Sequence, residues 1–233
     1  MQASTNDKTT DHNQVQDRPE QGNCGYFAGH TAIPLLGEEM IQACRHLPIG
    51  FMYDQECWSP VAITGLLQDE NLFVDSSGTW LADYLPVRIQ ACLLAPALGT
   101  KQEKMQADIG GLLFEKIAQA RKNTGQLLEL WSRLEILVPW KINVRNHALS
   151  KKISMEGVFQ VSAERIKDLD DESFIELRRQ GALEMIWAHW ISRLLLIDLA
   201  RKLPFSPGAL KNKILLDLDN GTLSREEKVF EFC

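Results

Sequence analysis

The chain has 233 residues, of which 45% are apolar and 24% are charged, a composition typical of a globular protein with a hydrophobic core. Its net charge of −6 at pH 7 and its pI of about 5.4 provide no basic surface for a nucleic-acid backbone or an anionic membrane. We therefore expect no nucleic-acid partner.

Three features of the sequence bear on where the protein is found. The first residues contain no basic region followed by an apolar run, so no secretory signal peptide is predicted. The most apolar stretch, residues 182–200, carries charged side chains that are costly in a bilayer, so no membrane span is predicted. The five cysteines are scattered without a CxxC pair, which favours a reducing compartment. Together these features predict a cytoplasmic protein.

Taken in chain order, the sequence begins with a polar tail. Residues 1–24 are rich in Gln, Asn, Asp and Thr and hold too few apolar side chains to offset the entropy of ordering, so this tail is predicted to be disordered. Residues 25–233 are predicted to form a single domain. This domain has a β-rich part over residues 25–98 and a mainly helical part over residues 108–233.

The β-rich part is predicted from short apolar runs that are bounded by Pro, Gly and polar turn residues. Consecutive strands are expected to pair as an antiparallel meander. Residues 75–78 are expected to turn, because Gly78 can adopt a positive φ. The expected elements are an extended segment at 30–34, a helix at 36–44, strands at 49–53, 61–67 and 71–75, and a fourth strand at 87–94.

The helical part is predicted from apolar residues at three- and four-residue spacing. Thr124 is expected to cap a new helix after a break at residues 123–125, and Ser162 and Asp170 are further expected N-caps. The expected order is a polar linker at 99–108, helices at 112–120 and 127–138, an irregular basic connection at 140–156, an extended piece at 157–161, helices after Ser162 and from Asp170 to Gly181, the longest helix at 182–203, a segment at 214–218, a turn at 220–221 and a final helix near Ser224. We therefore predict an α+β fold, in which a small, mainly antiparallel N-terminal sheet packs against a C-terminal helical layer.

Residues 71–88, which read NLFVDSSGTWLADYLPVR, are the most specific stretch of the chain. The chain also has LPIGF at 47–51, Pro60-Val61, Leu113-Phe114, LDDE at 169–172, GAL at 181–183 and Ala188-His189. In this order and spacing, over about residues 29–200, the sequence resembles the bacterial SapC family. The family usually continues after its Tyr-x-Pro with an arginine-rich Pro-Phe strand, whereas this chain has RIQACLL at residues 88–94.

The resemblance implies a general role for the protein but no particular chemical reaction. The family name refers to bacterial surface layers, so the resemblance implies a surface-layer association. Family members also lie beside genes for proteins similar to flavin halogenases and cupin-like oxygenases. That neighbourhood implies an accessory or peptide-binding role by analogy.

Five residues of the 71–88 segment are candidates for binding a partner: Asp75, Trp80, Asp83, Tyr84 and Arg88. Trp, Tyr and Arg are the residue types that dominate binding hot spots, and this segment combines them with two carboxylates. The alternative is that Trp80 and Tyr84 pack the sheet against the helices, because buried aromatic side chains dominate the energetics of cores.

Four further residues are secondary candidates. His30, Glu39 and His46 lie in the one local group of histidines and carboxylates, but their spacing matches no metal-binding motif, so neither a metal nor a cofactor is predicted. His189 has the residue type of a general base, and a hydrogen-bonded structural histidine is the alternative. Nucleophile elbows, phosphate loops and dinucleotide fingerprints do not occur.

These observations favour a non-enzymatic binding or accessory protein with a protein or peptide partner. Two other classes stay open. One is a metal-dependent enzyme that uses His30, Glu39 and His46 or the helix of His189, and the other is a structural protein of the surface layer. The sequence assigns no substrate and no oligomeric state.

Overall fold

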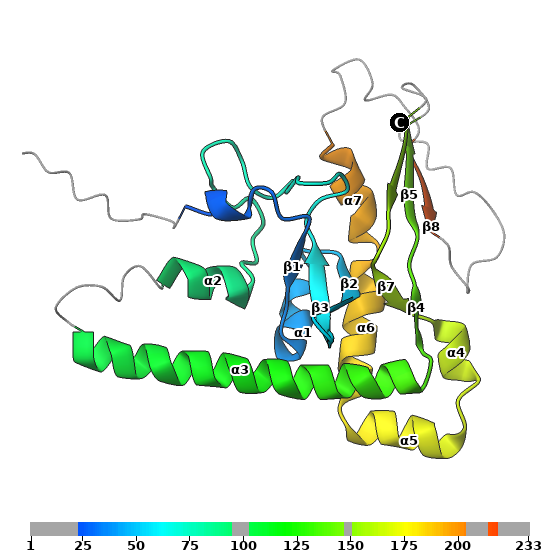
Figure 1. Ribbon diagram of the computed structural model, residues 1–233. Coiled ribbons are helices and arrows are strands. Elements are labelled where there is room, and N and C mark those ends of the chain that lie inside the picture. Colours follow the sequence, from blue (N-terminus) through cyan, green and yellow to red (C-terminus); the bar gives the residue numbers. More distant parts are fainter. Residues whose placement is uncertain (1–22, 95–102, 147–150, 204–213, 219–233) are drawn as a thin grey trace, which may run out of the picture.

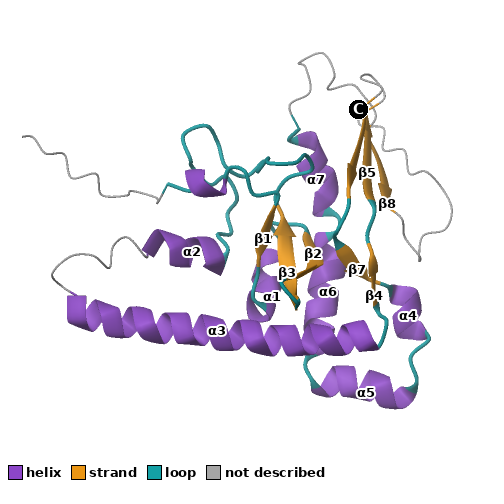
Figure 2. Ribbon diagram, in the orientation of Figure 1, coloured by secondary structure: helices purple, strands orange, loops and turns teal. Residues whose placement is uncertain are grey.

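The computed structural model describes residues 23–94, 103–146, 151–203 and 214–218 (Figure 1). In this part of the chain an antiparallel five-stranded sheet is combined with helices that come mainly from the C-terminal region (Figure 2). The predicted α+β fold is confirmed. Residues 1–22 of the predicted tail lie outside the described residues. Cys24 is buried and donates its N–H to the carbonyl oxygen of Gly78 at 2.7 Å.

The main sheet has the strand order β1-β3-β2-β7-β4, and all its neighbouring strands are antiparallel. β2 and β3 form a hairpin, and β7 joins it where Phe51 pairs with Phe159. Three strands of the first half of the chain therefore share one sheet with two strands of the second half. The strands are β1 (Ala32–Pro34), β2 (Ile49–Asp54), β3 (Cys57–Ile63), β4 (Leu137–Pro139) and β7 (Phe159–Val161).

Strand β3 of the β2–β3 hairpin begins earlier in the sequence than predicted. The strand at 49–53 is confirmed, whereas the strand predicted at 61–67 starts at Cys57. Gln55 and Glu56 connect the two strands with φ values of 48° and 59°, the positive values of a two-residue hairpin turn. Neither residue is a glycine, so the local sequence does not indicate this turn.

A second sheet of three strands has the order β6-β5-β8 and is also antiparallel. The prediction of an irregular connection at 140–156 is wrong, because apolar and polar residues alternate there and the pairing places Ile142 opposite Met155. The strands are β5 (Ile142–Asn146), β6 (Lys151–Met155) and β8 (Ile214–Leu218). The turn predicted at 220–221 and the final helix predicted near Ser224 lie outside the described residues.

Several helical predictions are confirmed at their N-termini. Ser162 Oγ accepts the N–H of Arg165 at 3.2 Å, and Asp170 Oδ1 accepts the N–H of Ser173 at 2.8 Å, so both residues are N-caps. The helix predicted at 36–44 is a 3-10 turn followed by a short α-helix. The helical elements are η1 (Gly25–Phe27), η2 (Gly37–Glu39), α1 (Met40–Ala43), α2 (Val87–Leu94), α3 (Glu103–Arg133), α4 (Ala163–Lys167), α5 (Asp171–Arg179), α6 (Ala182–Ser192) and α7 (Leu195–Arg201).

Helix α3 runs for 31 residues through the predicted break at 123–125. The hydroxyl group of Thr124 donates to the carbonyl oxygen of Ala120 at 2.8 Å, one turn back in the same helix, so Thr124 is not a cap. Gly125 lets the helix approach the sheet closely, because a Cβ at this position would lie 3.3 Å from Cys57 Sγ. The predicted break is therefore wrong, and the predicted linker is wrong from residue 103 onward because α3 begins there.

Two of the predicted strands are wrong. Residues 71–75 form an irregular segment whose one isolated bridge pairs Val74 with Trp80. Residues 87–94 form helix α2. The N–H of Val87 has no partner within the helix, and it donates to Oε2 of Glu39 at 2.9 Å. A carboxylate from a distant segment therefore stabilises this helix N-terminus, where negative charge is favourable.

The helix predicted at 182–203 is divided into α6 and α7. The hydroxyl group of Ser192 donates to the carbonyl oxygen of His189 at 2.7 Å and accepts the N–H of Ile49 at 3.0 Å. Such a bond to a preceding carbonyl competes with the regular helical pattern and favours a bend. The prediction of one continuous helix is wrong, and Ser192 connects the end of α6 to strand β2.

One cluster of buried side chains joins the sheet to the helices. The ring centroid of Phe51 in β2 lies 5.4 Å from that of Trp131 in α3 and 5.2 Å from that of His189 in α6. Figure 1 shows α6 beside β2 and β7, and α3 crossing the lower ends of the strands. The 71–88 segment leads from this core to α2.

Candidate functional site

Asn71 sets the start of the 71–88 segment. The Asn71 side chain is buried, and its amide group donates to the carbonyl oxygen of Phe27 at 3.0 Å. Its Oδ1 accepts the N–H of Phe73 at 2.9 Å, which turns the chain within two residues. The segment is thereby joined to the N-terminal η1 turn.

Asp75, the first of the candidate residues, holds the next turn. Its Oδ1 accepts the N–H groups of Ser77 and Thr79 at 2.8 and 2.9 Å, and it also accepts the Ser77 hydroxyl. The hydrogen bond from the Ser77 side chain and that from the Thr79 backbone lower the pKa of the Asp75 carboxyl group. Asp75 is therefore ionised and exposed, and it shapes the turn that leads to Trp80.

Trp80 is half-buried and packs within the segment. Its indole N–H donates to the carbonyl oxygen of Tyr84 at 2.9 Å, and its ring stacks on Phe73 with centroids 5.7 Å apart. The ammonium group of Lys202 lies 5.2 Å from the centre of the Phe73 ring. These contacts fix Trp80 against the core while leaving part of its ring accessible.

Tyr84 contacts one of the secondary candidates. Its hydroxyl group donates to Oε2 of Glu39 at 2.7 Å, and the same oxygen accepts the N–H of Val87. Oε1 of Glu39 accepts the N–H of Leu36 at 2.7 Å, so both oxygens of this buried carboxylate are hydrogen-bonded. Burial and the neighbouring Glu39 raise the pKa of the Tyr84 hydroxyl above its usual value. Glu39 thus fixes both Tyr84 and the start of α2.

Asp83 and His46 lie beside this pair. Oδ2 of Asp83 is 3.9 Å from Nδ1 of His46, and the Asp83 side chain is 93% exposed. The His46 ring stacks against Tyr84 at a centroid distance of 6.4 Å. Because a polar contact of this length at an exposed side chain contributes little energy, Asp83 and His46 add polar character to the surface beside Tyr84 without fixing it.

Arg88, in the first turn of α2, lies at a pocket between α2 and α3. We name this cavity the α2–α3 pocket, and its volume is about 140 Å³. It is lined by Pro34, Leu35, Leu36, Glu39, Val87, Arg88, Ala91, Cys92, Phe114, Ile117 and Arg121. An apolar cavity of about 150 Å³ accommodates one benzene ring, so the α2–α3 pocket is large enough for a single apolar side chain.

The charges at the α2–α3 pocket come from two arginines on different helices. Arg88 of α2 and Arg121 of α3 are both exposed, so they lie at its open side. The carboxylate of Glu39 is buried and already accepts three hydrogen bonds. The available charge at the pocket is therefore positive, and guanidinium groups suit a carboxylate ligand.

The structure separates the other secondary candidates. His30 packs on the rings of Tyr26 and Phe27, with centroids 5.1 and 5.4 Å away. Among the described residues, no group of three or more His, Cys, Asp or Glu side chains is arranged to hold a metal ion. His30, Glu39 and His46 are thus not brought together as a set of metal ligands.

His189 is fully buried in α6, and both ring nitrogens are hydrogen-bonded. The N–H of Val161 donates to Nε2 at 3.2 Å, so the ring proton is on Nδ1, which donates to the carbonyl oxygen of Ile49 at 2.8 Å. Burial lowers the pKa of His189 to about 3, and the charge of Arg193 acts in the same direction. The imidazole is therefore neutral at pH 7 and connects β2 to β7.

Sequence reasoning missed the lining of the α2–α3 pocket. Phe114, Ile117 and Arg121 recur along α3 at the spacing of one helix face, which is a visible signal. Their position opposite Arg88 could not be seen, because residues 87–94 were expected in a strand of the sheet. The role of Glu39 as the acceptor for Tyr84 and Val87 also lacks a local signal.

Comparisons with known proteins identify one family. The sequence model of the SapC family matches residues 8–107 and 99–199, which together span most of the chain. No curated protein and no solved structure matches the chain. Within the described part of the chain, no helix combines the length and the apolar character that crossing a bilayer requires.

Proposed function

The chain belongs to the SapC family, and from the geometry of its α2–α3 pocket we propose that it is a non-enzymatic binding protein for a peptide C-terminus. The last side chain of the peptide, which is apolar, occupies the pocket. The terminal carboxylate lies between Arg88 and Arg121. Both groups are attached to the same carbon atom of the peptide, which suits a small pocket with two cations at its opening.

The single observation that carries this proposal is the combination of size and charge at the pocket. A cavity of about 140 Å³ with a mainly apolar lining is large enough for one side chain, and two exposed arginines from different helices line it. A carboxylate between two guanidinium groups forms charge-assisted hydrogen bonds, which are stronger than neutral ones. Exposure of both arginines to solvent limits the affinity that they supply.

The hydrogen bonding of Glu39 and His189, two residues of the enzyme alternatives, supports binding over catalysis. Both oxygens of Glu39 accept hydrogen bonds from the protein, and both nitrogens of His189 are used in the core. The buried core includes residues from both halves of the chain, from Cys24 to Leu203. We therefore also propose that residues 25–233 act as one domain.

Fluorescence anisotropy with labelled peptides tests this proposal. Peptides that end in Phe or Leu with a free carboxylate should bind at least tenfold more tightly than the same peptides with an amidated C-terminus. Arg88→Ala and Arg121→Ala should each weaken binding by roughly five- to tenfold, less than the loss of a buried hydrogen bond to a charged group because both arginines are exposed. Ala91→Phe, which fills the pocket from its wall, should abolish binding.

The control is Arg179→Ala, which removes an exposed arginine of α5 that does not line the pocket. This variant should bind the free-carboxylate peptides as the unchanged protein does. Equal affinity for the amidated and free peptides would overturn the proposal. Loss of binding in Arg179→Ala to the same extent as in Arg88→Ala would do so too, because it would indicate a nonspecific effect of charge.

A further inference from the structure

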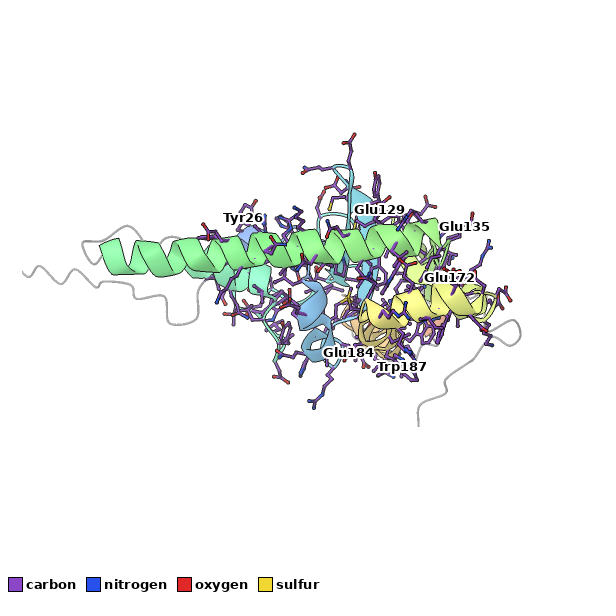
Figure 3. The ribbon with its side chains drawn as sticks, turned by 90° about the horizontal axis from the view of Figure 1, so that it is seen from below. Tyr26, Glu129, Glu135, Glu172, Glu184 and Trp187 are labelled. Atoms are coloured by element: carbon purple, nitrogen blue, oxygen red, sulfur yellow. The ribbon has the colours of Figure 1, made fainter. Side chains whose placement is uncertain are left out.

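A second and larger cavity lies farther along α3, and it shares no lining residue with the α2–α3 pocket. We name it the α3–α6 groove, and its volume is about 610 Å³. It is lined by Gly37, Glu38, Ile41, Ala120, Asn123, Thr124, Gln126, Leu127, Leu130, Arg133, Glu176, Gln180, Gly181, Glu184 and Met185. Figure 3 shows this face from below, with α3 on one side and Glu184 of α6 on the other.

The floor of the groove is a junction of three elements. The N–H of Gly37 in η2 donates to Thr124 Oγ1 of α3 at 3.0 Å. A Cβ at Gly37 would lie 2.9 Å from Thr124 Oγ1 and 3.0 Å from Met185 Sδ of α6, so only glycine allows this approach. The groove is therefore held open by fixed contacts beneath it, and its walls belong to helices.

The rim of the groove is acidic. Glu38, Glu176 and Glu184 stand on three different elements, and Arg133 is the one cationic lining residue, which gives three negative charges against one positive charge. All three glutamates are exposed. Within the described part of the chain, none of the three forms an ion pair. A net charge of −2 around one cavity attracts a cationic partner.

The groove also offers apolar surface between these charges. Ile41 of α1 lines it and is 45% exposed, and Leu127 and Leu130 of α3 line the opposite wall. A large exposed aliphatic side chain among carboxylates is complementary to an amphipathic helix that has apolar residues on one face and lysine or arginine on the other. The length of the α3 wall suits a helical segment laid along it.

We propose that the α3–α6 groove binds an amphipathic basic helix of a partner protein. The apolar face of that helix contacts Ile41 and Leu127, and its lysine or arginine side chains pair with Glu38, Glu176 and Glu184. This surface differs in charge from the α2–α3 pocket, which takes a carboxylate. The two surfaces share no lining residue, so a variant of one leaves the other intact.

The probe is a fluorescein-labelled amphipathic peptide of about 16 residues, long enough to form a helix, with Leu on one face and Lys on the other. A matched peptide with Glu in place of Lys is the comparison. The full chain should bind the lysine peptide at least tenfold more tightly than the glutamate peptide. Binding should weaken as salt is raised from about 50 to 500 mM, because exposed ion pairs are screened.

Substitution of the three rim glutamates tests whether the lysine peptide binds in the α3–α6 groove. Glu38→Gln, Glu176→Gln and Glu184→Gln together should weaken binding of the lysine peptide at least tenfold. The control combines Glu115→Gln, Glu129→Gln and Glu156→Gln, which make the same change in net charge at exposed positions outside the groove. This control should change the affinity less than twofold.

A second pair of variants tests the apolar contact. Ile41→Ser should weaken binding of the lysine peptide, whereas Tyr53→Ser, at a side chain of similar exposure outside the groove, should not. An equal loss of affinity for the lysine peptide in the two triple Glu→Gln variants would overturn the proposal, since the attraction would then reflect the net charge of the whole protein. Tighter binding of the glutamate peptide would overturn it as well.

Discussion

The hydroxyl group of Tyr84 donates a hydrogen bond to Oε2 of the buried Glu39 at 2.7 Å. Forty-five residues separate the two side chains in the sequence. Because the same oxygen accepts the N–H of Val87, this contact holds both the end of the 71–88 segment and the first turn of α2. Arg88 follows directly, so Glu39 fixes the position of the arginine at the α2–α3 pocket.

The first prediction concerns this contact. Tyr84→Phe removes one hydrogen bond to a charged acceptor and should lower the free energy of unfolding by about 1 kcal/mol, less than a fully buried bond because Tyr84 is partly exposed. Glu39→Gln weakens the acceptor of three donors and should cost roughly 2–3 kcal/mol. Urea denaturation followed by circular dichroism measures both values.

The control for the first prediction is Tyr53→Phe, which removes a hydroxyl from an exposed tyrosine of β2. It should leave the unfolding free energy unchanged. If the Glu39–Tyr84 contact is responsible, the free energy of unfolding of the variant that carries both Tyr84→Phe and Glu39→Gln should fall by less than the sum of the decreases in the two single variants. Additive losses would contradict a direct coupling.

The second prediction follows from the burial of His189. In the native state its pKa is about 3, whereas the exposed imidazole of the unfolded chain has the ordinary value of 6.5. Between these two pH values the unfolded state binds more protons than the native state, so stability falls as pH falls. This group should reduce the free energy of unfolding by about 1.4 kcal/mol per pH unit below pH 6.5.

His189→Asn provides the comparison for this pH dependence, because an amide keeps a donor for Ile49 and does not titrate. The variant should be less stable than the unchanged protein at pH 7, and the difference should shrink steadily from pH 6.5 towards pH 4. Chemical denaturation at several pH values gives both curves. Parallel curves for the two proteins would show that His189 titrates normally in the folded state.

Elements with a local signal could be predicted from the sequence. Ser162 and Asp170 are polar residues with a short side-chain acceptor directly before a helical pattern, and both are N-caps in the structure. Strand β2 is an apolar run between turn residues, and its extent is close to the predicted one. In each case the interactions that define the element lie within a few residues of it.

The start of helix α2 and the pairing of strands from the two halves of the chain depend on distant contacts that the local sequence does not show. Val87 begins a helix because Glu39, 48 residues earlier, accepts its N–H. The pairing of Phe51 with Phe159 brings two parts of the chain together that periodicity cannot relate. Extending this register by two residues places Ile49 opposite Val161, and the imidazole of His189 bridges that pair instead of a direct backbone bond. No pattern near residue 189 indicates this role.

The candidate residues show the same division. Trp80, Tyr84 and Arg88 are candidates because their residue types favour recognition. The structure places Arg88 at the α2–α3 pocket, whereas Tyr84 shares Glu39 Oε2 with the N–H of Val87. The other half of that pocket comes from α3. Residue types can therefore suggest one wall of a site, whereas the opposite wall follows from the fold.

The third prediction concerns Gly65, in the loop that leads from β3 to the 71–88 segment. A Cβ at this position would lie 1.9 Å from the backbone carbonyl oxygen of Glu70, far inside van der Waals contact. The loop is closed on both sides, because Gly65 donates its N–H to the carbonyl oxygen of Thr31 at 3.0 Å and Leu72 donates to Thr64 at 2.8 Å. A backbone atom held by these bonds cannot move aside as a flexible side chain does.

Gly65→Ala should therefore lower the free energy of unfolding by about 2 kcal/mol or more, as expected when a buried, well-packed position is overfilled. Gly29→Ala is the matched control, since the nearest atom to a Cβ there is 3.9 Å away, and its effect should stay within about 0.5 kcal/mol. Urea denaturation of both variants measures the difference. Equal stability of the two variants would mean that the loop opens without cost, and the close approach of Gly65 to Glu70 would then not be required for the position of the 71–88 segment.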